Sequence, residues 1–321
     1  MTDIAYQIKA STRAEITVLV DNYVDLLLPN QPGVIRPPLA KDGKVASKTL
    51  LAEHGLSLLI DTWEDDKRRR TLLDTGYNAG TAIHNMEMLA VSPESIDTLV
   101  LSHGHMDHTG SVNMLLEAIG KPVPVFCHPH AFRRRFLERP NVGLVEFPQL
   151  INREQIIERG AELYEEPGPV LFAGDTVLAT GQIPRMTPFE KGMPGAKMQT
   201  ESGLEQDNIE DDQSLVINVH GCGIVVISGC AHAGIVNSLQ YARELSGEER
   251  VCAVIGGFHL TGPDMASIID STVEEIRRIA PNMLVPMHCT GFAAIRRFQS
   301  EFPQSFVLSS VGTKLALPAH Q

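Results

Sequence analysis

The chain has 321 residues, of which 43% are hydrophobic and 21% charged, a composition typical of a folded globular protein. Its formal net charge of −12 argues against binding to nucleic acid or to an anionic membrane, because both require clustered basic residues. No segment approaches the roughly 20 apolar residues of a membrane span, and the N-terminus lacks a signal-peptide pattern. The five cysteines are scattered and odd in number, so we predict no disulfide framework and a cytoplasmic location.

Hydrophobic periodicity predicts strands mixed with helices along the chain, in a single domain over residues 1–321. In the first half, strands are predicted at 15–20, 56–60, 70–73, 96–101 and 123–127, with helices at 80–90 and 109–119. In the second half, strands are predicted at 176–179, 215–219, 223–228, 250–255, 283–287 and 306–308, with helices at 234–245, 264–279 and 293–302. The basic triplet 133–135 is interpreted as a helix face. This pattern predicts sheets that are covered by helices on one face each.

One long segment, residues 181–208, differs from its surroundings in composition. It is rich in proline and glycine and shows little apolar periodicity. A loop of this length inside a folded domain is usually functional or partly disordered. We therefore predict that residues 181–208 form a lid over the functional site.

The strongest chemical signal is the segment 102–108, which follows an apolar strand and places His103, His105, Asp107 and His108 within six positions. Imidazole and carboxylate groups are ligands that zinc and similar divalent metals prefer. In an extended loop, His103 and His105 can reach one metal, whereas Asp107 and His108 are displaced toward a second. The sequence therefore predicts two neighbouring metals that share a bridging water.

Further ligand-type residues follow other predicted strands. Cys230 and His232 follow one strand, His259 follows the next, and His288 follows the last core strand. Strands of one sheet can bring such ends together, which is the geometry that a metal cluster requires.

These motifs resemble the metallo-β-lactamase superfamily: the His103-x-His105-x-Asp107-His108 pattern, the preceding Asp74-Thr75-Gly76 turn and the distant strand-end ligands. The resemblance implies an α+β fold, an αββα sandwich with a long loop insertion and with the metals at the edge between the sheets. Six further segments resemble one subgroup, the dihydropterin-ribofuranosylaminobenzene 5′-phosphate synthase-like metal-dependent hydrolases. They are 21–23, 53–57, 102–105, 229–235, 256–260 and 288–291.

The chain departs from the superfamily pattern on the wall opposite the His-rich motif. The loop that usually supplies a third histidine reads Glu210-Asp211-Asp212-Gln213-Ser214, and the usual bridging aspartate is replaced by Cys230. The resemblance therefore suggests His232 as the displaced ligand, with Cys230 and Asp212 as further candidates.

Three more roles follow from the resemblance. His288 is expected to complete the second metal site, and Asp74 to orient ligands from behind. His259 is expected to ligate a metal, donate to the substrate or act as a general acid, with a purely structural role as the alternative. His54 is a candidate that approaches the same cavity.

These expectations favour a hydrolase in which a metal-bound hydroxide attacks an ester or phosphoester of a small molecule, with Asp107 and His259 as catalytic residues. Zinc is the first expectation for the metals, with iron and manganese as alternatives. The second hypothesis is a transferase that joins a dihydropterin diphosphate to a ribofuranosylaminobenzene phosphate, with Arg185, Lys191 and Lys197 as phosphate-binding candidates. A non-catalytic metal-binding sensor and a redox diiron protein are weaker alternatives, and a homo-oligomer is left open.

Overall fold

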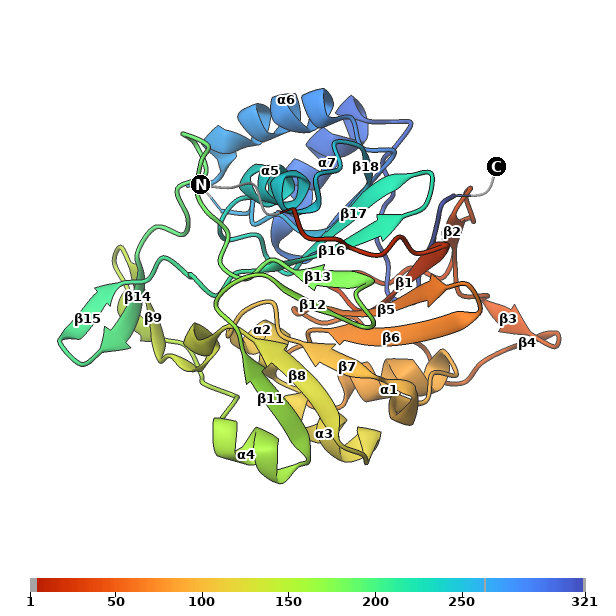
Figure 1. The fold of residues 1–321 in the computed structure, drawn as a ribbon, viewed down its shortest axis with the longest axis horizontal. Coiled ribbons are helices and arrows are strands. Elements are labelled where there is room, and N and C mark those ends of the chain that lie inside the picture. The colour runs from red at the N-terminus through yellow and green to blue at the C-terminus, as the bar shows by residue number, and fades with distance from the viewer. Residues whose placement is uncertain (1–4, 263, 320–321) are drawn as a thin grey trace.

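Two β-sheets packed face to face form the centre of the computed structural model, which describes residues 5–262 and 264–319 (Figure 1). The first sheet has the strand order β11 (Ala161–Glu165), β8 (Val123–Cys127), β7 (Thr98–Val100), β6 (Lys67–Leu73), β5 (Ser57–Glu64), β1 (Arg13–Val20), β20 (Lys314–Leu317) and β2 (Val34–Ile35). The second has the order β12 (Val170–Phe172), β13 (Val177–Ala179), β16 (Ser214–Val219), β17 (Gly223–Ser228), β18 (Val251–Gly257) and β19 (Met283–Met287).

The space between the two sheets is filled by alternate residues of their strands. Ile16 and Ile60 of the first sheet share one buried apolar cluster with Val225, Ile227 and Ile255 of the second. Side chains of a strand alternate between its faces, so the intervening residues point toward the outer layers. Strands β17, β18 and β19 run parallel and are buried on both faces, which explains their nearly unbroken apolar sequences.

Helices cover the outer face of each sheet (Figure 1). Helices α1 (Thr81–Met88), α3 (Val112–Ile119) and α4 (Arg153–Glu158) pack on the first sheet, and the short α2 (Met106–Thr109) carries part of the His-rich motif. Helices α5 (Ile235–Ser246), α6 (Ile269–Ile279) and α7 (Phe292–Glu301) pack on the second. The αββα sandwich predicted from the sequence is confirmed.

A smaller sheet projects from one side of the sandwich, with the order β10 (Gly143–Glu146), β9 (Arg135–Arg139), β14 (Ala196–Thr200) and β15 (Gly203–Gln206) (Figure 1). A two-stranded ribbon is formed by β3 (Ala40–Lys41) and β4 (Lys44–Val45). The prediction of a loop over 181–208 is wrong for its second half, because β14 and β15 form a hairpin that pairs with β9. The helix predicted around 133–135 is also wrong, since β9 begins at Arg135.

The strands near the C-terminus also differ from the prediction. The predicted strand 306–308 makes only one isolated bridge, from Phe306 to Leu284, whereas β20 was not predicted and pairs with β1. Within the described residues no helix is both long and apolar enough to cross a membrane. The expectation of an absent signal peptide rests partly on residues 1–4, which lie outside the residues that the structure describes.

One disulfide joins Cys222, in the turn after β16, to Cys252 of β18, a pairing that the prediction of no disulfide framework did not include. The two residues lie 30 positions apart in sequence, and only the parallel pairing of β17 with β18 brings them together. Cys127, Cys230 and Cys289 are free and buried.

Candidate metal centre

The predicted ligands meet where strand ends of the two large sheets face each other. His103 and His105 lie in the loop after β7 of the first sheet. Across from them, His232 follows β17 and His288 follows β19 in the second sheet. Gly104 is required in this loop because a β-carbon there would lie 2.0 Å from the carbonyl oxygen of Ala131.

The first group contains three imidazoles, those of His103, His105 and His232, with ligand nitrogens within 4.8 Å of one another. The Nδ1 atom of His105 lies 3.0 Å from Nε2 of His103 and 3.1 Å from Nε2 of His232. Burial lowers the pKa of His103 and His232 well below the usual histidine value and that of His105 to about 3, and neighbouring cationic groups add to this effect. Neutral, converging imidazoles are the form in which histidine binds a metal.

The second group contains Asp107, His108 and His288. The carboxylate Oδ2 of Asp107 lies 3.2 Å from Nε2 of His288 and 3.8 Å from Nε2 of His108. Burial acts to lower the pKa of His108, but the carboxylates of Asp74 and Asp107 outweigh it and raise that pKa to about 9. The same negative charges would favour a metal cation at this position, and the mixed oxygen and nitrogen donors suit a divalent ion.

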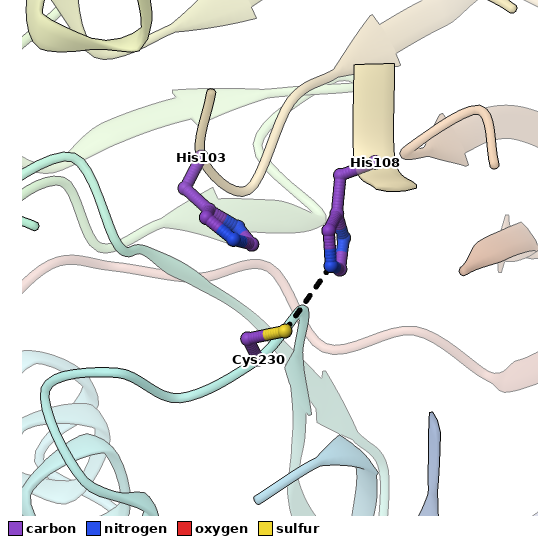
Figure 2. A group of neighbouring side chains, drawn as sticks. All are labelled: His103, His108 and Cys230. Atoms are coloured by element: carbon purple, nitrogen blue, oxygen red, sulfur yellow. Dashed lines mark hydrogen bonds between the residues drawn. The ribbon is translucent and has the colours of Figure 1, made fainter. Parts of the chain in front are cut away.

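Cys230 lies between the two groups, at the position where the superfamily pattern has an aspartate. Its Sγ lies 3.1 Å from Nε2 of His108, and the ligand atoms of His103, His108 and Cys230 all lie within 4.8 Å (Figure 2). Burial raises the pKa of the Cys230 thiol, so a bound cation would be needed to hold it as a thiolate. Cys230 can therefore contact either metal position.

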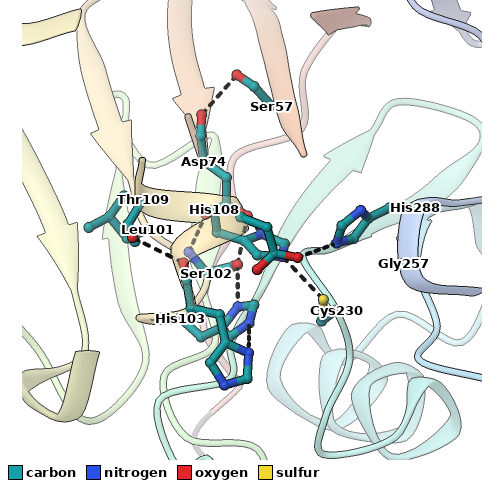
Figure 3. A network of polar contacts seen from close by, with 12 residues as sticks. Ser57, Asp74, Leu101, Ser102, His103, His108, Thr109, Cys230, Gly257 and His288 are labelled. Carbon is teal, nitrogen blue, oxygen red and sulfur yellow. Dashed lines mark hydrogen bonds and ion pairs between the residues drawn. The ribbon is translucent and has the colours of Figure 1, made fainter. Parts of the chain in front are cut away.

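Asp74 orients two of the histidines, His108 by a direct hydrogen bond and His103 through Ser102 (Figure 3). His108 donates from Nδ1 to Asp74 Oδ2 at 2.6 Å, and the Ser102 hydroxyl donates to the same oxygen at 2.7 Å. Because the Ser102 proton is used in this way, Nδ1 of His103, 2.9 Å from Ser102 Oγ, must be the donor in that contact. His103 then presents a free Nε2 lone pair toward the centre, and His108 would present one once a bound cation displaces its Nε2 proton.

We expect the Asp74→Asn variant to lose about 10- to 100-fold in metal affinity, a typical result of altering a group that orients ligands. The amide can accept from His108 or from Ser102 but cannot hold both donors with a full negative charge. Competition titration with a chromogenic chelator measures the affinity. Asp61→Asn is the matched control, because Asp61 is a buried carboxylate of β5 that pairs with Arg70 of β6. Equal affinities for Asp74→Asn and wild type would contradict this role.

The supporting roles of two carboxylates were not predicted from the sequence. The buried Asp211 accepts a hydrogen bond from the backbone N–H of Gly104 at 2.8 Å and forms an ion pair with the buried Arg135 of β9. On the other side, Asp21 accepts from the backbone N–H of His288 at 2.9 Å, and Asn22 donates to the His288 carbonyl oxygen. The available hints in the sequence were that Asp21 directly follows the strand β1 and that Asp211 shortly precedes the strand β16.

The remaining candidates lie around these groups. His54 is exposed, with Nε2 3.4 Å from Asp107 Oδ2, and His259 lies beside His232 with ring centroids 4.2 Å apart. Asp212 belongs to none of the metal-ligand groups among the described residues, and its Oδ2 accepts from the backbone N–H of Ala233. Burial raises the pKa of Asp212 to about 7.

A cavity of about 140 Å³ opens over the centre, and His54, His105, Asp107, His232 and His259 are among its lining residues. Met193, from the segment predicted as a lid, also lines it. Part of that segment therefore lies beside the centre, although the hairpin of β14 and β15 belongs to the smaller sheet.

A family sequence model and solved structures of known proteins match this chain and its fold. The sequence model of the Metallo-beta-lactamase superfamily matches residues 51–162, which include the His-rich motif. The crystal structure of Tm1679, described as a metal-dependent hydrolase of the beta-lactamase superfamily, superimposes with a TM-score of 0.69 at 23% identity, covering 94% of this chain and 98% of that chain. The metallo-β-lactamase fold protein YhfI from Bacillus subtilis superimposes with a TM-score of 0.53 at 12% identity, covering 95% and 99%.

Sequence similarity is higher to one protein of Methanocaldococcus jannaschii, named 7,8-dihydropterin-6-methyl-4-(beta-D-ribofuranosyl)-aminobenzene-5'-phosphate synthase. The two are 34% identical over 270 residues, covering 84% of this chain and 91% of the relative. With its fold and His-rich motif, the chain belongs to the metallo-β-lactamase superfamily, in the same family as this synthase.

Proposed function

We propose that the protein is a metal-dependent hydrolase that cleaves an ester or phosphoester of a small molecule at this centre. The observation that carries the proposal is the pair of neighbouring ligand groups, His103, His105 and His232 beside Asp107, His108 and His288, under one cavity. Two divalent metals held there, zinc by first choice and iron or manganese as alternatives, would supply Lewis acidity and activate water.

The chain's own residues would position the substrate and manage protons. Asp107 contacts both His54 and His288 and would hold the exposed His54 ring at the cavity. Both His54 and His259 line the cavity, but His54 precedes β5 of the first sheet, whereas His259 follows β18 of the second. We assign His259 as the donor to the leaving group. The cavity holds no lysine or arginine among its lining residues, so binding of a phosphoryl group would depend on the metals.

Metal removal tests this function directly. Dialysis against a chelator is expected to abolish hydrolysis of generic phosphodiester and carboxylester substrates, because no residue near the cavity replaces the metals as electrophile. Re-addition of zinc, iron or manganese in separate samples is expected to restore turnover and to rank the metals. Full activity of the metal-free protein, checked by elemental analysis, would contradict the proposal.

The transferase is the second candidate, and two observations favour it. The relative that is 34% identical is named a synthase, and a larger cavity of about 410 Å³ is lined by His288 and by residues such as Asn22, Phe292 and Arg296. A transferase needs room for a second organic substrate, which the cavity of about 140 Å³ does not offer. The predicted phosphate-binding residues Arg185, Lys191 and Lys197 line neither cavity.

The two reactions differ in what is consumed. A hydrolase turns over a single substrate in water, whereas the transferase releases diphosphate from a dihydropterin diphosphate only when the ribofuranosylaminobenzene phosphate is present. Measuring diphosphate release with and without that second substrate therefore separates the two reactions. A protein that binds metals but turns over neither set of substrates would favour the sensor.

A further inference from the structure

We propose that Cys230, His259 and Cys289 form a third metal-binding triad, selective for a thiophilic divalent ion such as Zn²⁺. Their ligand atoms all lie within 4.8 Å of one another. Cys230 and His259 also lie beside the two groups invoked for hydrolysis, but neither group accounts for Cys289 or for an ion bound by two sulfurs. This site therefore goes beyond the proposed function.

The three residues occupy equivalent positions after three neighbouring strands. Strands β17, β18 and β19 are adjacent and parallel, and they end at Ser228, Gly257 and Met287. Each ligand follows its strand end by two residues. In the register of the sheet, Ser228 pairs with Gly256 and Gly257 pairs with Met287, so the three ends lie nearly level. The sheet itself thus places the three side chains side by side.

The backbone around the triad is shaped to bring the two cysteines close. A β-carbon at Gly257 would lie 2.6 Å from Cys289 Sγ and 3.3 Å from Cys230 Cα, so only glycine fits between them. His259 has a left-handed φ of 45°, which is strained for a residue that is not glycine. Such strain persists where the surrounding structure enforces it, and it concentrates at functional sites.

The side chains have the chemistry of a metal site. Cys230 and Cys289 are 3% and 6% exposed, and Nδ1 of His259 is buried without a hydrogen-bond partner in the described part of the chain. Two thiolates and one neutral imidazole would cancel the charge of a divalent ion, and this donor set favours zinc over harder metals. All three residues line the cavity, so a fourth coordination position would face it. With one His259 nitrogen on the ion, the other can still donate to a substrate.

Counting metals in the reduced protein tests the triad. Metal-free protein loaded with Co²⁺ is expected to bind three ions per chain and to show sulfur-to-cobalt charge-transfer absorption. Cys289→Ser and His259→Ala are each expected to bind one ion fewer, and Cys289→Ser to lose most of that absorption. Cys127→Ser, at a buried free cysteine in β8 outside every ligand group, is the matched control and keeps all three ions.

A second measurement does not depend on variants. X-ray absorption of the zinc-loaded wild type is expected to show an ion with two sulfur neighbours. Two ions per chain with no ion bound by two sulfurs would overturn the proposal, as would a Cys289→Ser protein with unchanged metal content and absorption. Hydrolase activity enters none of these readouts, so this proposal and the proposed function can fail separately.

Discussion

The His103→Ala variant is expected to lose turnover by roughly a thousandfold, together with the metal of the first group. Removal of one oriented group that stabilises transition-state charge costs on the order of 10²–10³-fold, and here the metal itself would be lost with its ligand. His103 is fully buried, and its Nε2 lies 3.0 Å from His105 Nδ1, so the substitution removes one of three converging imidazoles. Turnover after metal reconstitution, with metal content from elemental analysis, measures the effect.

The control for this variant is His220→Ala, which removes an exposed histidine that belongs to no ligand group. It is expected to match wild type in both metal content and turnover. If His103→Ala kept the full metal content of the wild type and wild-type turnover, the first group would not be a metal site.

The Arg135→Met variant is expected to lower the free energy of unfolding by about 3–5 kcal/mol, the usual cost of removing one partner of a buried ion pair. Arg135 is buried against Asp207 and Asp211, with both carboxylates also shielded from water. Burial alone would raise the pKa of Asp211, but the Arg135 guanidinium outweighs it and holds that pKa below its usual range. Without Arg135, a buried charge loses its partner next to the Gly104 backbone.

Urea unfolding followed by circular dichroism measures this loss, and the adjacent Arg134→Met is the control. Arg134 pairs with Glu146, but both side chains are about half exposed, and surface pairs contribute at most about 1 kcal/mol. Equal losses for the two variants would show that the Arg135 pair has no special role. A secondary loss of metal affinity is expected for Arg135→Met alone, because Asp211 holds the loop of His103 and His105 through Gly104.

The elements that could be predicted from the sequence are those with strong hydrophobic patterns. Strands such as β17 and β19 are almost entirely apolar because they are buried between the first sheet and the covering helices, and α3 carries a clear buried stripe. The strands of the smaller sheet were missed because they are short and mostly exposed, as β15 illustrates. Their polar residues give no period-two signal, and only pairing with β9 makes them strands.

The candidate site divides in the same way. His103, His105, Asp107 and His108 are close in sequence, so a local pattern reveals them. Cys289 and Asp211 have no local pattern, since each acts through a residue more than fifty positions away. The disulfide of Cys222 and Cys252 was missed for the same reason, because strand pairing rather than spacing brings the two together.

The division of the ligands between the two sheets has a mechanical consequence. His105 belongs to one half of the sandwich and His232 to the other, and Asp107 and His288 are split in the same way. Any ion bound by such a pair cross-links the two layers, and separating them would require its release. Metal affinity then becomes part of the cohesion of the fold, and resistance to heat should grow with the logarithm of the free metal concentration.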